Sequence, residues 1–200
     1  VKKLYDKTLG VIKKDTSLDW NIRLDGPYGE SSKTILKTQH AILVGAGYGI
    51  SRFAPILQDI FLQLKNNTNS LPLKKIDLHW IIEDQSYFEW FTKLLYDISD
   101  KSGIFNYHIY FIDKTPGSFN EKLLYISTNA GEKDTSVYLM DNLWEASSFS
   151  LPAWDDVLME KTDKNFDLIR KVFYCGPGKY LKSLKKSCSK LNISINSKNF

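Results

Sequence analysis

Three glycines at alternate positions follow an apolar run in the stretch HAILVGAGYGIS, residues 40–51. Gly45, Gly47 and Gly49 come where a buried strand would end. A glycine backbone adopts positive φ at little cost and lets a phosphate group come close. The stretch therefore suggests a backbone cradle for a nucleotide, although a plain tight turn between a strand and a helix would use the same glycines.

The residues after the glycines could add to such a cradle. We expect a helix to begin near Gly49 and Ile50 and to point its free N–H groups at the loop, where the helix dipole favours an anion. Ser51 would add a hydroxyl group and Arg52 a positive charge. The spacing G-x-G-x-G is not the G-x-G-x-x-G dinucleotide fingerprint, and no Gly-Lys-Ser/Thr of a P-loop follows.

A second glycine turn, CGPG at 175–178, also follows a predicted strand and opens a predicted helix. Two such turns at two strand ends of one sheet are a stronger signal than either turn alone. Cys175 has two interpretations. It could be a small buried residue, or it could place a thiol beside a nicotinamide ring.

Strands and helices alternate along the chain, which predicts an α/β fold: a Rossmann-like parallel sheet with helices on both faces. The carboxyl ends of its strands would bring together the loops 45–51, 83–86 and 175–178 and the region around Pro152. A long polar excursion is expected at 113–136, with a short helix near 121–126. The predicted strands are 40–44, 76–82, 107–112, 171–174 and 193–196, and the main helices are 50–64, 88–98, 154–160 and 179–191.

Composition fits one domain of a soluble protein, because 42% of the 200 residues are hydrophobic and 25% are charged. The net charge of +4 is spread along the chain, and the basic cluster 182–190 has the spacing of a solvated helix face, so we predict no nucleic-acid partner. Two cysteines favour a reducing compartment. No signal peptide or membrane-spanning run is present in these residues, and the missing initiator Met suggests a fragment or a processed product.

Several motifs occur along the chain in one order: DGPYG (25–29), VGAGYGIS (44–51), HWIIED (79–84) with FEWF (88–91), PAW (152–154), YCGP (174–177) and the terminal NF (199–200). This ordered set resembles the C-terminal dehydrogenase domain of the NADPH oxidases. That family includes the dual oxidases and plant respiratory burst oxidases, and it belongs with the ferric reductases to the ferredoxin-NADP reductase superfamily. The resemblance implies the fold of the NADP-binding domain of ferredoxin-NADP reductases.

The resemblance implies a function for the chain as part of a larger oxidase. Residues 25–200 would bind NADPH or NADH and pass a hydride to FAD, and residues 1–24 would be the end of a flavin-binding domain or a linker. Electrons would then cross a membrane through haem b to oxygen, giving superoxide or hydrogen peroxide. FAD and haem would be bound outside this chain, which would be inactive without those domains.

The resemblance also implies partners and a location. The partners would be the protein's own flavin-binding and transmembrane haem domains, and cytosolic activators could meet it. The chain would lie at the cytosolic face of a membrane without inserting into it.

The family's site residues transfer onto this chain where its motifs match. Three residues would position the nicotinamide against the flavin: Ser51, Cys175 and Phe200. No metal site is predicted, because His40, His79 and His108 lie in or beside predicted strands. The residues implied in cofactor binding are Pro27, Gly45, Ala46, Gly47, Tyr48, Gly49, Ile50, Ser51, Arg52, Glu83, Asp84, Pro152, Trp154, Cys175, Gly176 and Pro177.

Three positions depart from the family pattern. Arg52 stands where the family commonly has Pro, and Glu83 and Leu151 stand where it commonly has Arg. A carboxylate at the end of the second strand suits a free ribose 2′-hydroxyl and repels a 2′-phosphate, which predicts a weakened preference for NADPH and a shift toward NADH. Arg52 or a lysine could compensate for the charge of Glu83. The alternative is a catalytically degenerate Rossmann-like module that regulates or binds partners.

Overall fold

The computed structural model of the 200-residue chain describes residues 34–66, 72–83, 91, 95, 103–112, 147–148, 150–159 and 168–198. Several predictions lie outside these residues. They concern the segment 1–24, the polar excursion 113–136 with its short helix, and the site residues Pro27, Asp84 and Phe200.

The described strands form one six-stranded sheet in the order β4-β3-β2-β1-β5-β6, and every neighbouring pair is parallel. This confirms the predicted parallel sheet. β4 was not predicted, because two serines carry no apolar pattern. The strands are β1 His40–Ala46, β2 Lys75–Ile82, β3 Phe105–Phe111, β4 Ser147–Ser148, β5 Arg170–Cys175 and β6 Ser194–Lys198.

The chain reverses its direction of travel across the sheet next to β1. From β1 it moves outward through β2, β3 and β4, and it then returns to the other side of β1 for β5 and β6. β1 therefore pairs with β2 on one side and with β5 on the other, with Gly45 opposite both Trp80 and Cys175. Ligands of open α/β sheets bind beyond the strand ends at such a switch point, where both glycine turns lie.

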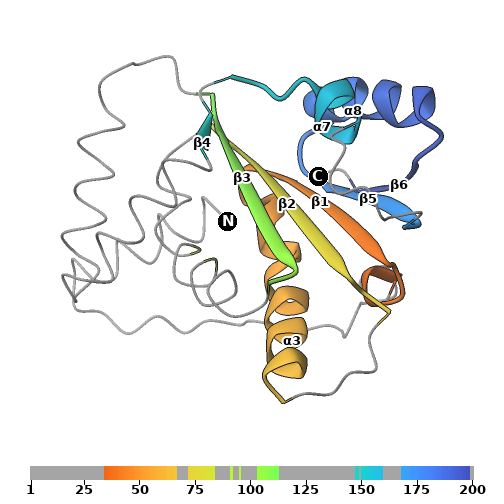
Figure 1. The fold of residues 1–200 in the computed structure, drawn as a ribbon. Coiled ribbons are helices and arrows are strands. Elements are labelled where there is room, and N and C mark those ends of the chain that lie inside the picture. Colours follow the sequence, from red (N-terminus) through yellow and green to blue (C-terminus); the bar gives the residue numbers. More distant parts are fainter. Residues whose placement is uncertain are drawn as a thin grey trace, which may run out of the picture.

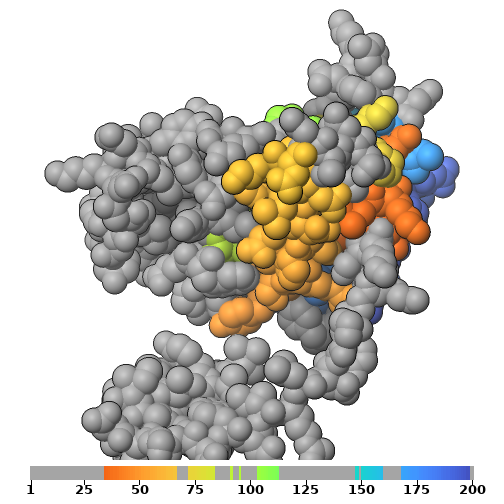
Figure 2. All heavy atoms as spheres, turned by 90° about the horizontal axis from the view of Figure 1, so that it is seen from below, coloured from red at the N-terminus to blue at the C-terminus, as the bar shows by residue number. Residues whose placement is uncertain are grey.

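Helices cover both faces of the sheet, as predicted (Figure 1). α3, Ala54–Lys65, packs its buried side on one face, and the opposite side of this helix is part of the molecular surface (Figure 2). The other face carries α7, Trp154–Met159, and α8, Gly178–Lys190. Lys190 of α8 bonds Asp155 of α7 at 2.7 Å, so these two helices are also joined to each other.

The helix after the first glycine loop begins later than predicted. Residues Gly47–Arg52 form a 3₁₀ helix, η1, and the α-helix starts only at Ala54. Pro55 lies in the first turn of α3, where its fixed φ and missing N–H suit a helix start. The expectation of an α-helix from Gly49 and Ile50 is therefore wrong, and the N–H groups nearest the loop belong to the 3₁₀ turn.

The remaining helices agree with the sequence to within a residue or two where they are described. α7 and α8 match the predicted helices near 154–160 and 179–191. Of the predicted helix 88–98, only Phe91 and Leu95 are described. Both are buried, and the Leu95 N–H donates to the Phe91 carbonyl at 3.1 Å, which is helical spacing.

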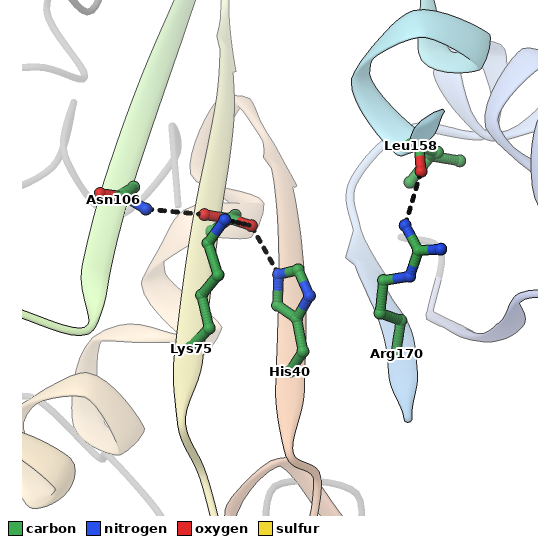
Figure 3. Close-up of polar contacts among 6 residues, drawn as sticks. His40, Lys75, Asn106, Leu158 and Arg170 are labelled. Atoms are coloured by element: carbon green, nitrogen blue, oxygen red, sulfur yellow. Dashed lines mark hydrogen bonds and ion pairs between the residues drawn. The ribbon is translucent and has the colours of Figure 1, made fainter. Parts of the chain in front are cut away.

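A polar network holds the amino ends of the strands together, opposite the glycine turns (Figure 3). Asp77 lies 2.5 Å from His40 Nε2, accepts from Asn106 at 3.1 Å and lies 3.4 Å from Lys75 Nζ. Burial raises the pKa of the Asp77 carboxyl, but the hydrogen bonds with His40 and Asn106 outweigh it and lower this pKa to about 2. Arg170 donates to the Leu158 carbonyl at 2.8 Å and ties β5 to α7.

Candidate nucleotide-binding site

The two glycine turns lie against each other at the switch point. A Cβ built on Gly49 would stand 2.0 Å from the Cys175 carbonyl oxygen, and one on Gly176 would stand 2.7 Å from the Ala46 Cβ. Both distances are far below van der Waals contact, so only glycine fits at these positions. The structure thus brings together the two turns that the sequence singled out, although they are separated by more than a hundred residues.

The first turn is fixed by its own backbone and by a buried tryptophan. Gly47 has φ of 55°, in the left-handed region that favours glycine. Its carbonyl accepts a hydrogen bond from Trp80 Nε1 at 3.2 Å. Trp80 is buried in β2 and was not predicted as a site residue. The residue pattern of a strand shows which face a side chain occupies, but not which group accepts a hydrogen bond from its indole N–H.

The predicted site residues around the first turn differ in how far their side chains are exposed. Tyr48 is 47% exposed and Ser51 is also exposed, whereas the Ile50 side chain is fully buried in the core. Ile50 can therefore meet a ligand only through its backbone. The Ser51 hydroxyl donates to the Tyr48 carbonyl at 2.8 Å, which closes the 3₁₀ turn.

Cys175 ends β5 with a buried side chain that is 4% exposed. Burial raises the pKa of its thiol, and this outweighs the nearby charge and hydrogen bond of Arg52, which act in the opposite direction. At neutral pH the group is a protonated thiol and not a nucleophilic thiolate. Of the two interpretations of Cys175, its packing agrees with that of a small buried residue.

The second turn is braced on both sides. The Tyr174 hydroxyl donates to the Pro177 carbonyl at 2.5 Å, and the Gly176 N–H donates to the Lys198 carbonyl of β6 at 3.3 Å. Burial raises the pKa of the Tyr174 hydroxyl, and the neighbouring Cys175 adds to this rise, so the hydroxyl remains a donor at neutral pH. These bonds hold the turn at the end of β5.

Glu83, directly after β2, reaches the start of α8. Its Oε1 accepts from the Tyr180 hydroxyl at 2.5 Å and lies 2.7 Å from Lys179 Nζ. Burial raises the pKa of Glu83, but the hydrogen bonds from Lys179 and Tyr180 outweigh it, so this pKa is lowered and the carboxylate is ionised. The sequence analysis missed both partners, because nothing in a sequence joins positions 97 residues apart.

The PAW motif is placed differently from the glycine turns. The Trp154 ring is buried between α7 and the sheet, with its centroid 5.9 Å from that of His79 and 6.3 Å from that of Tyr110. Pro152 is partly exposed, and Leu151, where the family commonly has Arg, is exposed. Trp154 therefore contributes to the core under the site.

The residues present fit a dinucleotide phosphate group. Gly49 and Gly176 exclude a side chain and Gly47 has a positive φ, so backbone from both turns lies together beyond the ends of β1 and β5. Among the described residues, no group of three His, Cys, Asp or Glu side chains could hold a metal ion. The described helices include none long and apolar enough to cross a bilayer.

Comparison with known proteins decides the family. Residues 38–189, most of the chain, match the family described as Ferric reductase NAD binding domain. The chain belongs to the ferric reductase NAD-binding domain family. Its match covers both glycine turns, Glu83, and the start of α8 with Lys179 and Tyr180, so the geometry described above is that of a ferric reductase NAD-binding domain.

Relatives of this ferric reductase NAD-binding domain are oxidases. It is 30% identical over 91% of its length to a superoxide-generating NADPH oxidase heavy chain of Dictyostelium discoideum, and 29% identical over 84% to NADPH oxidase 1 of Mus musculus. The chain spans 35% and 28% of those two proteins. Among solved structures, the cytochrome b5 reductase domain of Ulva prolifera nitrate reductase aligns with a TM-score of 0.48 and 14% identity, over 82% of this chain and 50% of that one.

Proposed function

We propose that this chain binds NADPH or NADH across its two glycine turns and presents the nicotinamide to a flavin, as the dehydrogenase domain of an NADPH oxidase. The observation that carries the proposal is the packing of Gly49 on the Cys175 carbonyl at the switch point of the sheet. That contact places backbone of both turns together, where the phosphates of the nucleotide would lie.

The proposed roles of the residues are those that the family resemblance implies. The turn from Gly45 to Gly49 would hold the pyrophosphate with backbone N–H groups, and Arg52 would add charge. Cys175, Gly176 and Pro177 would flank the nicotinamide ribose and ring, with Ser51 and Phe200 as further positioning residues. A bound nicotinamide supplies the hydride, so the chain's own contribution is to position the reactants and exclude water, with no protein acid or base.

The wider reaction is part of the same proposal and rests on the relatives. FAD and haem b would be held by other domains of the parent protein, which would pass electrons across a membrane to oxygen. The chain would then work at the cytosolic face of that membrane, in contact with its own flavin-binding and haem domains and with cytosolic activators. Its relatives are named for superoxide generation and NADPH oxidation.

The test is a titration of the 200-residue chain with NADPH and with NADH, followed by calorimetry and by NMR shift changes at low salt. We expect at least one nucleotide to bind and to move the signals of Gly45, Gly47, Gly49 and Gly176 more than those of Gly103, which lies before β3. Binding that leaves the four glycines unmoved would contradict the proposed site.

Absence of binding calls for one further measurement. The titration is then repeated with the flavin-binding domain attached, because the nicotinamide pocket would be completed by that domain. Binding restored in the longer protein would support the proposal. Absence of binding there too would overturn it in favour of the degenerate regulatory module.

A further inference from the structure

Three side chains from two distant segments meet at the edge of the proposed site: Glu83, Lys179 and Tyr180. Glu83 follows the last residue of β2, and β2 lies beside β1 with Ile81 opposite Ala46. Lys179 and Tyr180 lie in the first turn of α8, just after the second glycine turn. The cluster therefore stands next to both turns.

The bonds within the cluster use only part of its capacity. The Tyr180 hydroxyl and Lys179 Nζ both bond Oε1 of Glu83, and no described residue bonds Oε2. The side chains of Lys179 and Glu83 are 57% and 42% exposed, so Oε2 and the exposed side of the ammonium group can reach a ligand. Tyr180 is buried, and the Lys179 ammonium lies 4.8 Å above its ring, which fixes where the charge sits.

The charges of the cluster bear on one chemical difference between nucleotides. An acid at the end of the second strand accepts a hydrogen bond from the ribose 2′-hydroxyl of NADH, and it repels the 2′-phosphate of NADPH. At 2.7 Å from Glu83, the Lys179 ammonium cancels the carboxylate charge as seen from the site. The charge of Glu83 alone would repel the 2′-phosphate, but the pair of Glu83 and Lys179 has no net charge and does not repel it.

We propose that Lys179 sets the nucleotide specificity of this site by neutralising Glu83, so that its adenosine end accepts either a 2′-hydroxyl or a 2′-phosphate. The inference rests on the proposed function. It chooses between two sequence-based expectations: Glu83 alone predicts a preference for NADH, and Lys179 is the lysine that compensates for its charge. Tyr180 is a positioning residue that holds Oε1 and leaves Oε2 for the ribose.

The test uses two small probes of the adenosine end, 5′-AMP and adenosine 2′,5′-bisphosphate, titrated by calorimetry into the chain at low salt. We expect the unchanged protein to bind both. Lys179→Met should weaken the bisphosphate about tenfold and leave 5′-AMP within about twofold, because only the bisphosphate then meets the bare charge of Glu83. Glu83→Gln should strengthen the bisphosphate relative to 5′-AMP, because Lys179 is then free to contact the 2′-phosphate.

The matched control is Lys182→Met, which removes the same charge from the next exposed lysine of α8. It should change neither ratio. Added salt should shrink the effect of Lys179→Met, since screening weakens contacts between exposed charges. Circular dichroism confirms that each variant is folded before its affinities are compared.

The outcomes separate the two proposals. If both probes bind and the ratio stays the same in Lys179→Met and Glu83→Gln, the inference is wrong and the proposed function stands. An equal shift in Lys182→Met would mean that the general field of α8 acts and not the pair with Glu83, which also overturns the inference. If neither probe nor either full nucleotide binds, even with the flavin-binding domain attached, the proposed function and this inference fail together.

Discussion

Gly49 and Cys175 are packed backbone to backbone, with the position of a Gly49 Cβ only 2.0 Å from the Cys175 carbonyl oxygen. This contact couples the two glycine turns, so that neither can shift without the other. The site at the switch point is therefore a single rigid unit made from the ends of β1 and β5.

Gly49→Ala should disrupt that unit. The methyl group cannot fit against backbone, so the two turns must separate, and we expect a loss of about 2 to 3 kcal/mol in the free energy of unfolding. Nucleotide affinity should fall by at least about tenfold, because the cradle opens. Urea unfolding and calorimetric titration measure the two effects.

Gly103→Ala is the control for that variant. Gly103 also has positive φ, of 60°, but a Cβ there would meet nothing within 4 Å. It should cost about 1 kcal/mol of stability and leave nucleotide binding unchanged. Equal losses of affinity in the two variants would mean that binding follows stability and not the contact with Cys175.

Trp80→Phe tests how the first turn is held. Phenylalanine keeps an aromatic ring beside Phe91, 5.3 Å away between centroids, but it removes the N–H that donates to the Gly47 carbonyl. We expect about 1 kcal/mol less stability and a several-fold loss of nucleotide affinity. Hydrogen exchange at the amides of Gly47 and Gly49 should also accelerate. Unchanged exchange there would show that the indole bond does not hold the turn.

His79 should make the fold sensitive to mild acid. Burial lowers the pKa of its imidazole to about 3, with a smaller contribution from His108, whereas an unfolded histidine titrates near 6.5. Below pH 6.5, His79 is therefore protonated in the unfolded chain but stays neutral in the folded chain. This one group should remove about 2 kcal/mol of stability between pH 7 and pH 5.

The matched variants separate this effect from packing. His79 Nδ1 lies 3.0 Å from the Tyr110 hydroxyl, so the double variant His79→Phe with Tyr110→Phe removes both members of this hydrogen bond. It should lose less stability than the unchanged protein from pH 7 to pH 5 in urea unfolding. Tyr110→Phe alone keeps the imidazole and should keep the acid sensitivity. The idea fails if all three proteins lose stability equally.

Asp77 should act with the same sign as His79 but in a lower pH range, because folding also lowers its pKa. Its folded pKa of about 2 lies below the ordinary 3.8, so the ionised group stabilises the fold fully above pH 4, and this contribution is lost as the pH falls through about 2. Asp77→Asn should therefore cost about 2 kcal/mol at pH 7 and less at pH 3. Asp59→Asn, at an exposed position of α3, is the control and should cost little at either pH. A cost that is the same at both pH values would contradict the assignment.

The two central strands β1 and β2 could be predicted because nearly all of their residues are buried. β1 is buried throughout and β2 along its last five residues, and covering on both faces produces continuous apolar runs that are visible in a sequence. The start of α3 could not be read from periodicity, because the 3₁₀ turn also buries Ile50 and so continues the apolar spacing. Pro55 was the available signal.

In the candidate site, only the glycine turns, which are formed by backbone, could be predicted from the sequence. Glycines announce a close approach or a positive φ by their type alone, and Gly47, Gly49 and Gly176 all have one or both in the structure. The contact between Glu83 and Lys179 depends on how α8 packs over the sheet, so no local pattern contains it. The charge near Glu83 is therefore set by Glu83 and Lys179 together, and the sequence position of Glu83 alone does not predict it.

The strand order has a consequence for the synthesis of the protein. His40 of β1 pairs with Lys75 and also with Arg170, so one neighbour of β1 is synthesised soon after it and the other much later. A nascent chain that stops before residue 170 lacks β5, so the first turn then has no second turn to pack against. Closing so long a loop is slow. Bound nucleotide is therefore expected to stabilise the newly made protein only after β5 and the second turn have been synthesised.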